Sequence, residues 1–286
     1  METFAGGWKR SYYGKGDVIA YRLNRNGITP EGQSPVFGAN VKILIYGEAF
    51  WPTYASGDNT GLIATDSMKN FVQRETINYA GPDLESYCKF LAAKFMETYP
   101  QVEGAQISAV EIPWFRVPGQ TAAFSPAGPE RLTARIEIDR SGIVEIASGI
   151  VGFRMLRLCG SSFTGFVRDE YTTLPEIRNR PLHMWLDLEW TYANSEAAFS
   201  EGRIAGKVRE IVYNSFGSFE SSSIQQVICQ IGGKILAEIG CISEVHLEAN
   251  NRTWDTVIES GEALGVYTDP RPPYGCLGLR LRREKQ

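Results

Sequence analysis

The sequence predicts an α+β fold in which antiparallel sheets are covered by pairs of helices. Several stretches alternate polar and apolar residues with a period of two, which is typical of strands with one polar face. Other stretches carry apolar residues at helical spacing, and these helices come in consecutive pairs between groups of strands. A βαβ arrangement would need strands and helices to alternate singly, which they do not, so antiparallel sheets are favoured.

Two helices are predicted in the first half of the chain. The first follows Thr65, and the second covers 84–99, where Pro82 and Asp83 suit the first turn. One side of the first helix carries Met68, Phe71, Val72 and Tyr79. The apolar residues of the second helix are Leu84, Tyr87, Cys88, Leu91, Phe95 and Tyr99.

A second helix pair is predicted in the other half, at 199–216 and 221–239. Ser221, Ser222 and Ser223 can supply the N-cap of the later helix. The apolar residues of the earlier helix are Ile204, Val208, Ile211, Val212 and Phe216. Those of the later helix are Ile224, Val227, Ile228, Ile231, Ile235 and Ile239.

Strands are predicted where apolar and polar residues alternate most regularly, at 132–139, 186–192 and 277–282. His246 lies in a stretch with the same alternation, so we expect a solvated structural histidine on the polar face of a strand. Segment 118–130 contains three prolines among small residues and is predicted to be a long loop.

The order strand-strand-helix-helix-strand-strand occurs twice, which divides the chain into units at 1–145 and 146–286. The boundary falls near 142–150, where Ser-Gly pairs interrupt the pattern. One such unit leaves sheet edges open, and closure by partner copies removes those edges. We therefore expect a homo-oligomer.

The composition narrows the function classes. The 286 residues carry a net charge of −4 with a pI near 5.5, whereas nucleic-acid-binding domains usually have a basic excess, so we expect no nucleic-acid partner. No apolar run approaches the roughly 18 residues that cross a membrane, so no membrane partner is expected. The five cysteines show no CxxC spacing, which predicts reduced thiols. The C-terminus lacks the peroxisomal address Ser-Lys-Leu, so we expect a cytoplasmic protein. Two histidines and no clustered cysteines predict no metal site of the usual ligand type.

The most specific motif is segment 160–176, which reads Gly-Ser-Ser-Phe-Thr-Gly-Phe-Val-Arg-Asp-Glu-Tyr-Thr-Thr-Leu-Pro-Glu and is followed by Arg180. It places aromatic residues, charges and a threonine pair in one predicted loop, in which Tyr171-Thr172-Thr173 is expected to orient the backbone. The segment closely resembles the signature loop of the urate oxidase (uricase) family. The resemblance extends over about residues 12 to 282.

The resemblance implies a fold, a reaction and an assembly. It implies tandem tunnelling-fold (T-fold) units, whose sheets close a barrel when the subunits assemble, most simply as a homotetramer. It implies a urate oxidase that converts urate and O2 to 5-hydroxyisourate and H2O2. No cofactor is implied, because the electron-rich urate anion is itself the electron source for O2.

Lys15 and Thr65 are the catalytic residues that the resemblance implies. Lys15 lies in a segment that matches the family's opening strand, and Thr65 corresponds to its catalytic threonine. In the family these two residues come from different subunits. A lysine accepts a proton near neutral pH only where burial or nearby positive charge lowers its pKa.

Phe163, Arg180, Ile224 and Gln225 are the substrate-binding residues that the resemblance implies. A urate anion is a flat ring with a rim of carbonyl and N–H groups. Arg180 can donate two parallel hydrogen bonds to such a rim, and Gln225 can donate and accept at the neighbouring edge. Phe163 can cover the ring face. Ile224 accompanies Gln225 in a Ser-Ile-Gln motif that matches the family's Ser-Val-Gln.

Asn250 and Arg252 complete the implied site. Asn250 matches the asparagine near the oxygen site. The family's Asn-Lys-His is replaced by Asn250-Asn251-Arg252, so an arginine stands where the histidine of the Lys-Thr-His relay is expected. A guanidinium cannot take up a proton, so Arg252 is predicted to bind an anionic substrate group or to lower the pKa of Lys15. A further small departure is Asn179, where an aspartate usually precedes the arginine.

Each residue has a simpler interpretation. Lys15 alone is a solvated lysine, Thr65 a helix N-cap, Phe163 a core residue, Gln225 a capping partner, and Arg180 an ion-pair partner of Asp169 or Glu170. Their joint occurrence in family order favours the functional interpretation. Because Arg252 alters the proton-handling part, two alternatives stay open: an enzyme for another purine- or pterin-like heterocycle, and a non-catalytic heterocycle-binding protein.

Overall fold

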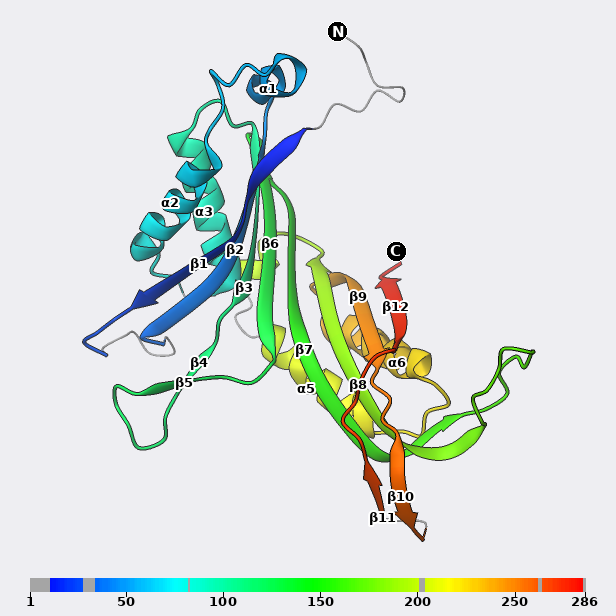
Figure 1. Ribbon diagram of the computed structural model, residues 1–286. Helices are drawn as coiled ribbons and strands as arrows, with labels where there is room; N and C mark the ends of the chain where they lie inside the picture. The colour runs from blue at the N-terminus through cyan, green and yellow to red at the C-terminus, as the bar shows by residue number, and fades with distance from the viewer. Residues whose placement is uncertain (1–10, 28–33, 82, 201–203, 262–263, 285–286) are drawn as a thin grey trace. The chain divides into compact units, whose positions relative to one another are not determined.

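The computed structural model describes residues 11–27, 34–81, 83–200, 204–261 and 264–284. The chain forms two compact units, Met1–Ser148 with Ser195–Ser200, and Gly149–Asn194 with Glu201–Gln286 (Figure 1). It passes from the first unit to the second within one strand, β7 (Gly142–Phe163), so the Ser-Gly pair at 148–149 lies inside a strand. Helices and antiparallel strand pairs occur in both units, which confirms the predicted α+β class.

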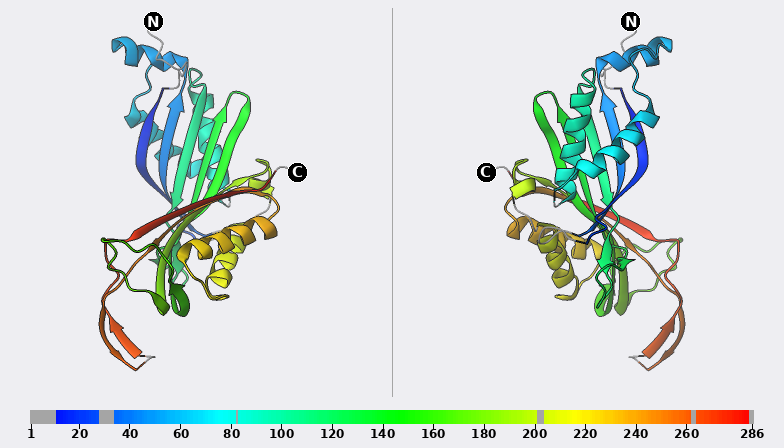
Figure 2. Two further views of the ribbon diagram at one scale, coloured as in Figure 1. Left: turned by 90° about the vertical axis from the view of Figure 1, so that its right-hand side faces the viewer. Right: turned by 90° about the vertical axis from the view of Figure 1, so that its left-hand side faces the viewer.

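The first unit is a sheet with two helices on one face. Its strands follow the order β1-β2-β3-β6-β7. Besides β7 these are β1 (Tyr12–Leu23), β2 (Val36–Tyr46), β3 (Gly104–Glu111) and β6 (Arg131–Asp139). The helices are α2 (Thr65–Glu75) and α3 (Leu84–Thr98). Helix α2 packs on β1, and α3 packs on β3 and β6, so both predicted helices are confirmed (Figure 2).

The ends of these helices differ from the prediction in detail. Tyr79 is not part of α2, because the Thr76 hydroxyl donates to the Val72 carbonyl at 2.7 Å and the chain tightens into a 3₁₀ turn. Tyr79 follows in an extended conformation and is still buried. Asp83 is the N-cap of α3 rather than part of its first turn, since its carboxylate accepts from the Ser86 N–H at 2.7 Å. Pro82 lies outside the described residues.

Shorter elements connect the main strands and helices of the first unit. They are η1 (Glu48–Phe50), α1 (Trp51–Ser56), η2 (Thr76–Asn78), β4 (Trp114–Arg116), β5 (Phe124–Pro126) and α4 (Ala197–Ser200). The prediction of a continuous loop at 118–130 is wrong, because β5 pairs with β4. Pro126 is tolerated there because it ends an edge strand.

The second unit repeats the arrangement. Its strands follow the order β7-β8-β9-β12, with β8 (Ile177–Tyr192), β9 (Ile242–Asn251) and β12 (Gly275–Arg282). A separate hairpin is formed by β10 (Thr256–Ser260) and β11 (Leu264–Tyr267). The helices are α5 (Ile204–Gly217) and α6 (Ile224–Glu238). Helix α6 packs on β9 and β12, and α5 packs on α6.

Two boundaries in this unit differ from the prediction. Strand β8 begins well before the predicted 186, because β7 on one side supplies a partner for its early residues. The predicted helix at 199–216 begins at Ile204, and 199–200 belong to α4 of the first unit. Residues 201–203 lie outside the described part.

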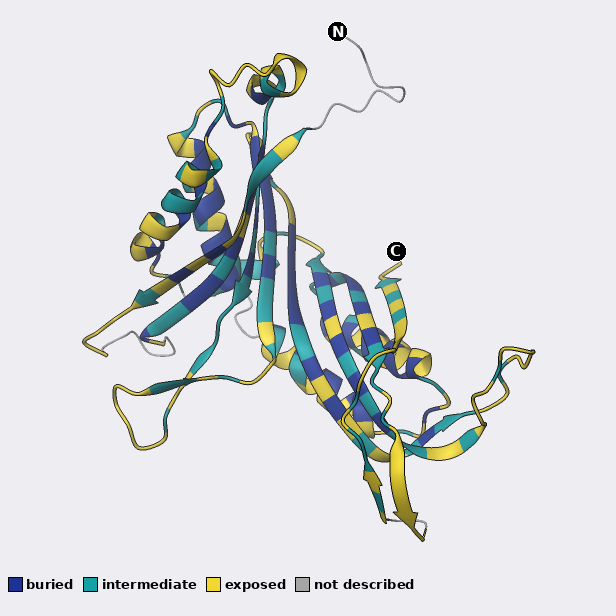
Figure 3. Ribbon diagram, in the orientation of Figure 1, coloured by how far each residue is buried: buried dark blue, intermediate teal, exposed yellow. Residues whose placement is uncertain are grey.

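The period-two pattern gives the sheet of the second unit one buried face. In β8 the side chains of Leu186, Leu188 and Trp190 are at most 3% exposed, whereas the residues between them are more accessible (Figure 3). His246 lies between two buried residues of β9 and is itself partly accessible, so its predicted place on the polar face is confirmed. No described helix combines the length and the hydropathy that a membrane span requires.

Candidate functional site

Segment 160–176 is a strand end followed by a loop, and the prediction of a single loop is wrong at its start. Its first four residues complete β7, whose neighbour in the sheet is β8. The loop is ordered by Asp169, whose Oδ1 accepts from the Tyr171 N–H at 3.0 Å and from the Thr172 hydroxyl at 2.9 Å. The Asp169 N–H donates in turn to the Thr172 hydroxyl at 3.0 Å. Thr172 therefore shapes the backbone here.

Phe163 and Arg180 are brought together because one ends β7 and the other lies near the start of the neighbouring β8. The guanidinium carbon of Arg180 is 5.7 Å from the centre of the Phe163 ring. Phe166 stacks on that ring, with 4.9 Å between centres and 13° between planes. The two strand ends are also tied by the Asn179 Oδ1, which accepts from the Gly160 N–H at 2.8 Å. Phe163 is only partly buried, as a stacking residue requires.

Arg180 is a partly buried cation without a protein counter-charge among the described residues. Its Nε is buried there and has no hydrogen-bond partner, and no ion pair joins it to Asp169 or Glu170 in the described part. Burial alone lowers the pKa of its guanidinium. Leaving a buried N–H without an acceptor costs about 1–3 kcal/mol. The structural ion-pair alternative is therefore wrong for Arg180, and an anionic ligand would supply the missing acceptor.

The start of α6 leaves Gln225 free of capping. The Ser223 hydroxyl is the N-cap and accepts from the Gln226 N–H at 3.2 Å, while the Gln226 Oε1 accepts from the Ser222 N–H at 2.8 Å. This reciprocal pair resembles a capping box. Gln225 is exposed, so the capping alternative belongs to Gln226 instead. The Ile224 side chain is 5% exposed, so only its backbone N–H, at the unpaired start of the helix, can reach a ligand.

A short bridge holds the start of α6 against the end of β7. Ser161 pairs with Ser221 in an isolated parallel bridge. The Ser162 N–H donates to the Ser221 carbonyl at 2.8 Å, and the Ser221 N–H donates to the Gly160 carbonyl at 2.9 Å. Because Phe163 is the last residue of β7, the bridge places it in the same part of the unit as Ile224 and Gln225.

Arg157 stabilises this junction and was not predicted. From β7 it donates to the carbonyls of Phe216 at 3.0 Å and Phe219 at 2.8 Å, and to the Ser221 hydroxyl. These acceptors lie at the end of α5 and in the connection to α6, where carbonyls lack partners within the helix. An arginine in a strand resembles any other polar-face residue in the sequence, so only the register of the fold identifies it.

Asn250 and Arg252 lie at the end of β9, and aromatic rings enclose the arginine. Asn250 is opposite Trp185 of β8 in the register. The guanidinium carbon of Arg252 lies 4.0 Å from the centre of the Trp185 ring and 3.9 Å from that of the Tyr274 ring. The Arg252 Nε–H donates to the Asn250 Oδ1 at 2.9 Å. Its guanidinium is thus held by neighbouring side chains, which a purely substrate-binding role does not require.

His183 is the histidine nearest to these two residues. Its carbonyl accepts from the Arg252 N–H at 3.1 Å, and its ring stacks on Trp254 with 5.6 Å between centres. Burial lowers the pKa of His183, and the positive charge of Arg154 lowers it further. Asp269 opposes this shift, and Arg252 adds the smallest lowering effect. Its Nδ1 is buried without a partner among the described residues. No sequence pattern marked this residue.

Lys15 and Thr65 both belong to the first unit. Thr65 is the first residue of α2 and not its N-cap, which is Ala64, so the simple capping alternative is wrong. Lys15 lies on β1, partly buried. Within the described residues of one chain, no hydrogen bond joins it to Thr65. Lys69 lowers the pKa of the neighbouring Asp66 by a hydrogen bond and its charge, and Lys15 contributes a smaller effect, so Lys15 lies near the start of α2.

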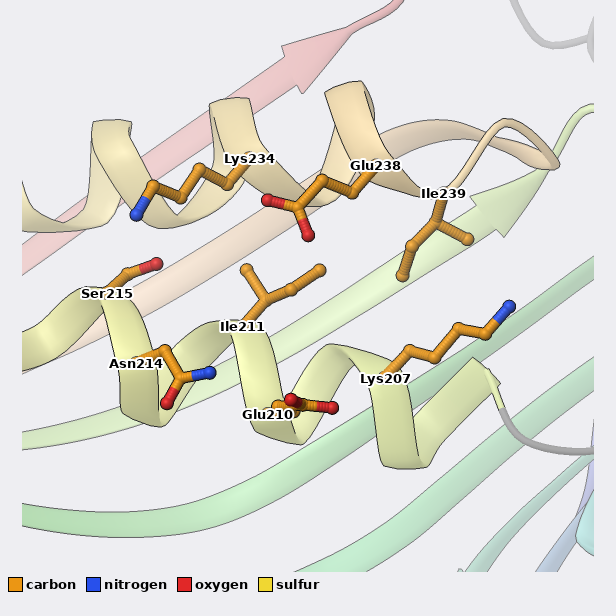
Figure 4. Close-up of a pocket in the computed structure, with 8 residues that line it drawn as sticks. All are labelled: Lys207, Glu210, Ile211, Asn214, Ser215, Lys234, Glu238 and Ile239. Atoms are coloured by element: carbon orange, nitrogen blue, oxygen red, sulfur yellow. The ribbon is translucent and has the colours of Figure 1, made fainter.

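A cavity of about 250 Å³ between α5 and α6 contains none of the predicted site residues (Figure 4). Its lining consists of Lys207, Glu210, Ile211, Asn214, Ser215, Lys234, Glu238 and Ile239. Because side chains of both charges line this cavity, it would not bind an anionic ring selectively. The predicted residues of the second unit instead gather at strand ends and at the start of α6.

Comparison with known proteins agrees with this geometry. A family model described as Uricase matches residues 48–137 and 146–276. The uricase of Halalkalicoccus jeotgali is 36% identical over 91% of this chain and 94% of its own. The crystal structure of the Bacillus sp. TB-90 urate oxidase has a TM-score of 0.85 at 36% identity and covers 96% of this chain and 100% of that one. The chain therefore belongs to the uricase family and has the tunnelling fold.

Two of the relatives, both bifunctional proteins, are longer, and the chain spans about 60% of each. The uric acid degradation bifunctional protein PucL of Bacillus subtilis is 37% identical over 95% of this chain but only 61% of its own length. The chain thus spans about three fifths of that bifunctional protein.

Proposed function

We propose that this protein is a cofactor-independent urate oxidase, which converts urate, O2 and water to 5-hydroxyisourate and H2O2. The single observation that carries the proposal is the buried Nε of Arg180, which lacks an acceptor among the described residues. A flat anion beside the Phe163 ring would provide that acceptor and accept a second, parallel hydrogen bond. Membership of the uricase family supports urate as this anion.

The other residues take roles that follow from their positions. Gln225 and the Ile224 backbone N–H, both at the start of α6, bind the ring edge that Arg180 leaves free. Phe163 covers one ring face. Asn250 lies where O2 binds, and Arg252 lies next to Asn250. Electrons pass from the urate anion to O2, so catalysis requires a group that removes a proton from urate. Lys15 and Thr65 supply that step.

We infer from the resemblance to the family that the complete site is assembled from more than one copy of the chain. Lys15 and Thr65 belong to the first unit and the ring-binding residues to the second. We propose a homotetramer in which one subunit supplies Lys15 and Thr65 to the ring site of another, with 1–145 and 146–286 as the two T-fold domains. Light scattering that shows a monomer of 31.8 kDa at working concentrations would refute the assembly. The five cysteines are free thiols, which supports a cytoplasmic location.

The proposal is tested by urate absorbance decay with parallel detection of H2O2. Arg180→Ala and Gln225→Ala should each weaken urate binding by about 1.5–3 kcal/mol, or roughly tenfold to a hundredfold in Kd. The matched controls are Arg178→Ala and Gln230→Ala, since both residues are exposed on the same strand or helix. Unchanged affinity in both test variants, measured by calorimetry, would remove this site from consideration.

Lys15→Met and Thr65→Ala should abolish turnover while urate binding persists, because they act on the proton and not on the ring. Arg252 favours a second candidate, an enzyme for another purine- or pterin-like heterocycle. That candidate predicts tight binding of such a ring and no consumption of urate. A protein that binds urate yet never consumes O2 would instead be a non-catalytic binding protein.

A further inference from the structure

Arg252 determines which way the amide of Asn250 faces. An arginine side chain carries hydrogen-bond donors and no acceptor. The amide atom 2.9 Å from the Arg252 Nε must therefore be Oδ1. The Nδ2 group, with its two N–H donors, consequently faces away from Arg252. If the neighbouring group could also accept a hydrogen bond, the amide could face it with either its oxygen or its nitrogen.

The guanidinium is itself restricted. The rings of Trp185 and Tyr274 both lie about 4 Å from its central carbon. Cation–π contacts of this kind attract the guanidinium to both ring faces. Its backbone is also fixed, because the Arg252 N–H donates to the His183 carbonyl at 3.1 Å. The arginine that orients the Asn250 amide is thus held from two neighbouring segments.

We propose that Arg252 is a positioning residue that presents the two N–H donors of Asn250 to the oxygen species in the site. The inference rests on the proposed function and names how oxygen would be held. Electron transfer from urate places negative charge on O2, and preorganised donors aimed at developing charge stabilise it. A neutral histidine could accept a hydrogen bond from the amide and turn it, so arginine and histidine are not equivalent here.

The surroundings make this orientation insensitive to pH. From β8 the neighbouring titratable group is His183, whose pKa is lowered by burial and by Arg154 and Arg252. From the segment before β12 come Asp269, which opposes that shift, and Tyr274, which contacts the guanidinium through its ring. His183 is therefore neutral near pH 7 and adds no second charge beside Arg252.

The test is a double-mutant cycle with Arg252→Met and Asn250→Ala. Oxygen consumption is measured against O2 concentration, and urate affinity is measured without O2. Arg252→Met should raise the KM for O2 roughly threefold to tenfold, the effect of one hydrogen bond, and leave urate affinity unchanged. In the Asn250→Ala background the same substitution should have no further effect, because Arg252 acts through that amide.

Two further variants separate positioning from general structural support. Arg252→Lys should partly restore the KM for O2, since an ammonium also only donates. Arg252→His should match the wild type at low pH and show a rising KM for O2 as the imidazole loses its proton, across about pH 6 to 9. A profile parallel to that of the wild type would contradict the inference.

Additive effects of the two substitutions would overturn this inference but not the proposed function. A weakened urate affinity in Arg252→Met would also overturn only the inference, because it would show that Arg252 binds the substrate. Wild-type protein that binds urate but consumes no O2 would refute the proposed function, and the inference with it. The two failures are therefore distinguishable.

Discussion

Replacing Arg180 by methionine should make the protein more stable and less able to bind urate. The side chain is partly buried, and burial lowers the pKa of its guanidinium, so the folded chain holds a cation in an unfavourable place. Its Nε has no acceptor among the described residues. Methionine has a similar length and no polar group, so it removes this cost without leaving a large cavity. The opposite effects on stability and binding distinguish a ligand-binding arginine from a structural one.

The magnitude follows from two contributions. An unsatisfied buried N–H costs about 1–3 kcal/mol, and the lower part of that range applies because Arg180 is only partly buried. Against this, the contact of the guanidinium with the Phe163 ring, at 5.7 Å, contributes about 0.5 kcal/mol that the variant loses. The net gain is about 1 kcal/mol, or a rise in Tm of roughly 2–4 °C for a chain of this size.

The assay is thermal unfolding of wild type, Arg180→Met and the exposed control Arg178→Met at one protein concentration, because an oligomer has a concentration-dependent Tm. Without ligand, Arg180→Met should unfold at the highest temperature. Saturating urate should then raise the Tm of the wild type and of the control, and barely that of Arg180→Met, so that their order reverses. If Arg180→Met unfolds below the wild type without ligand, Arg180 is a structural residue and the reasoning is wrong.

Three other predictions concern the supports of the site and the core. Ser223→Ala should lower the free energy of unfolding by about 1 kcal/mol and weaken urate binding, as measured by urea denaturation and calorimetry, because the N-cap fixes the start of α6. Arg157→Met should destabilise by about 2 kcal/mol, since two carbonyls lose a charged donor; unchanged urate affinity would show that the junction does not position the ring site. Burial raises the pKa of Glu85, so the folded state binds its proton more tightly than the unfolded chain. Stability should therefore fall as pH rises from the ordinary glutamate pKa through the raised one, and urea denaturation of Glu85→Gln should show a smaller fall.

The elements that the sequence predicts best are those whose own periodicity decides their structure. Helices α3 and α6 each bury a continuous apolar stripe and begin at a capping residue, and their bounds agree with the prediction to within a few residues. Strand β7 was harder to predict, because its Ser-Gly pair at 148–149 resembles a break. Neighbouring strands on both sides keep it extended there, and that influence is absent from the local sequence. The three-residue strands β4 and β5 are too short for any period to show.

The residues of the candidate site likewise differ in how far the sequence predicts them. The family motifs point to Arg180 and Asn250 because their chemistry suits an anionic ring and oxygen. The aromatic enclosure of Arg252 was not predictable, since Trp185 and Tyr274 come from separate segments that meet only through strand register. The same holds for Arg157, whose acceptors lie about sixty residues further along the chain.

The two units place a corresponding residue in different environments. In α3 the N-cap Asp83 is followed two residues later by Glu85, and in α6 the N-cap Ser223 is followed two residues later by Gln225. Glu85 is turned inward, where its carboxylate accepts from the Ser148 hydroxyl and burial raises its pKa. Gln225 is exposed and has no role in the cap.

The second position of the helix therefore faces inward in one unit and is available to a ligand in the other. Because the Glu85 carboxylate is directed inward, onto the Ser148 hydroxyl, it is not presented to a ligand as the exposed Gln225 amide is. The first unit thus offers no exposed side chain at this position of α3. The residues proposed for the proton step lie elsewhere in that unit, Lys15 on β1 and Thr65 at the start of α2. Under the proposed function, this divergence gives the doubled fold one kind of ring site, at the start of α6, and assigns the proton step to residues of the other unit.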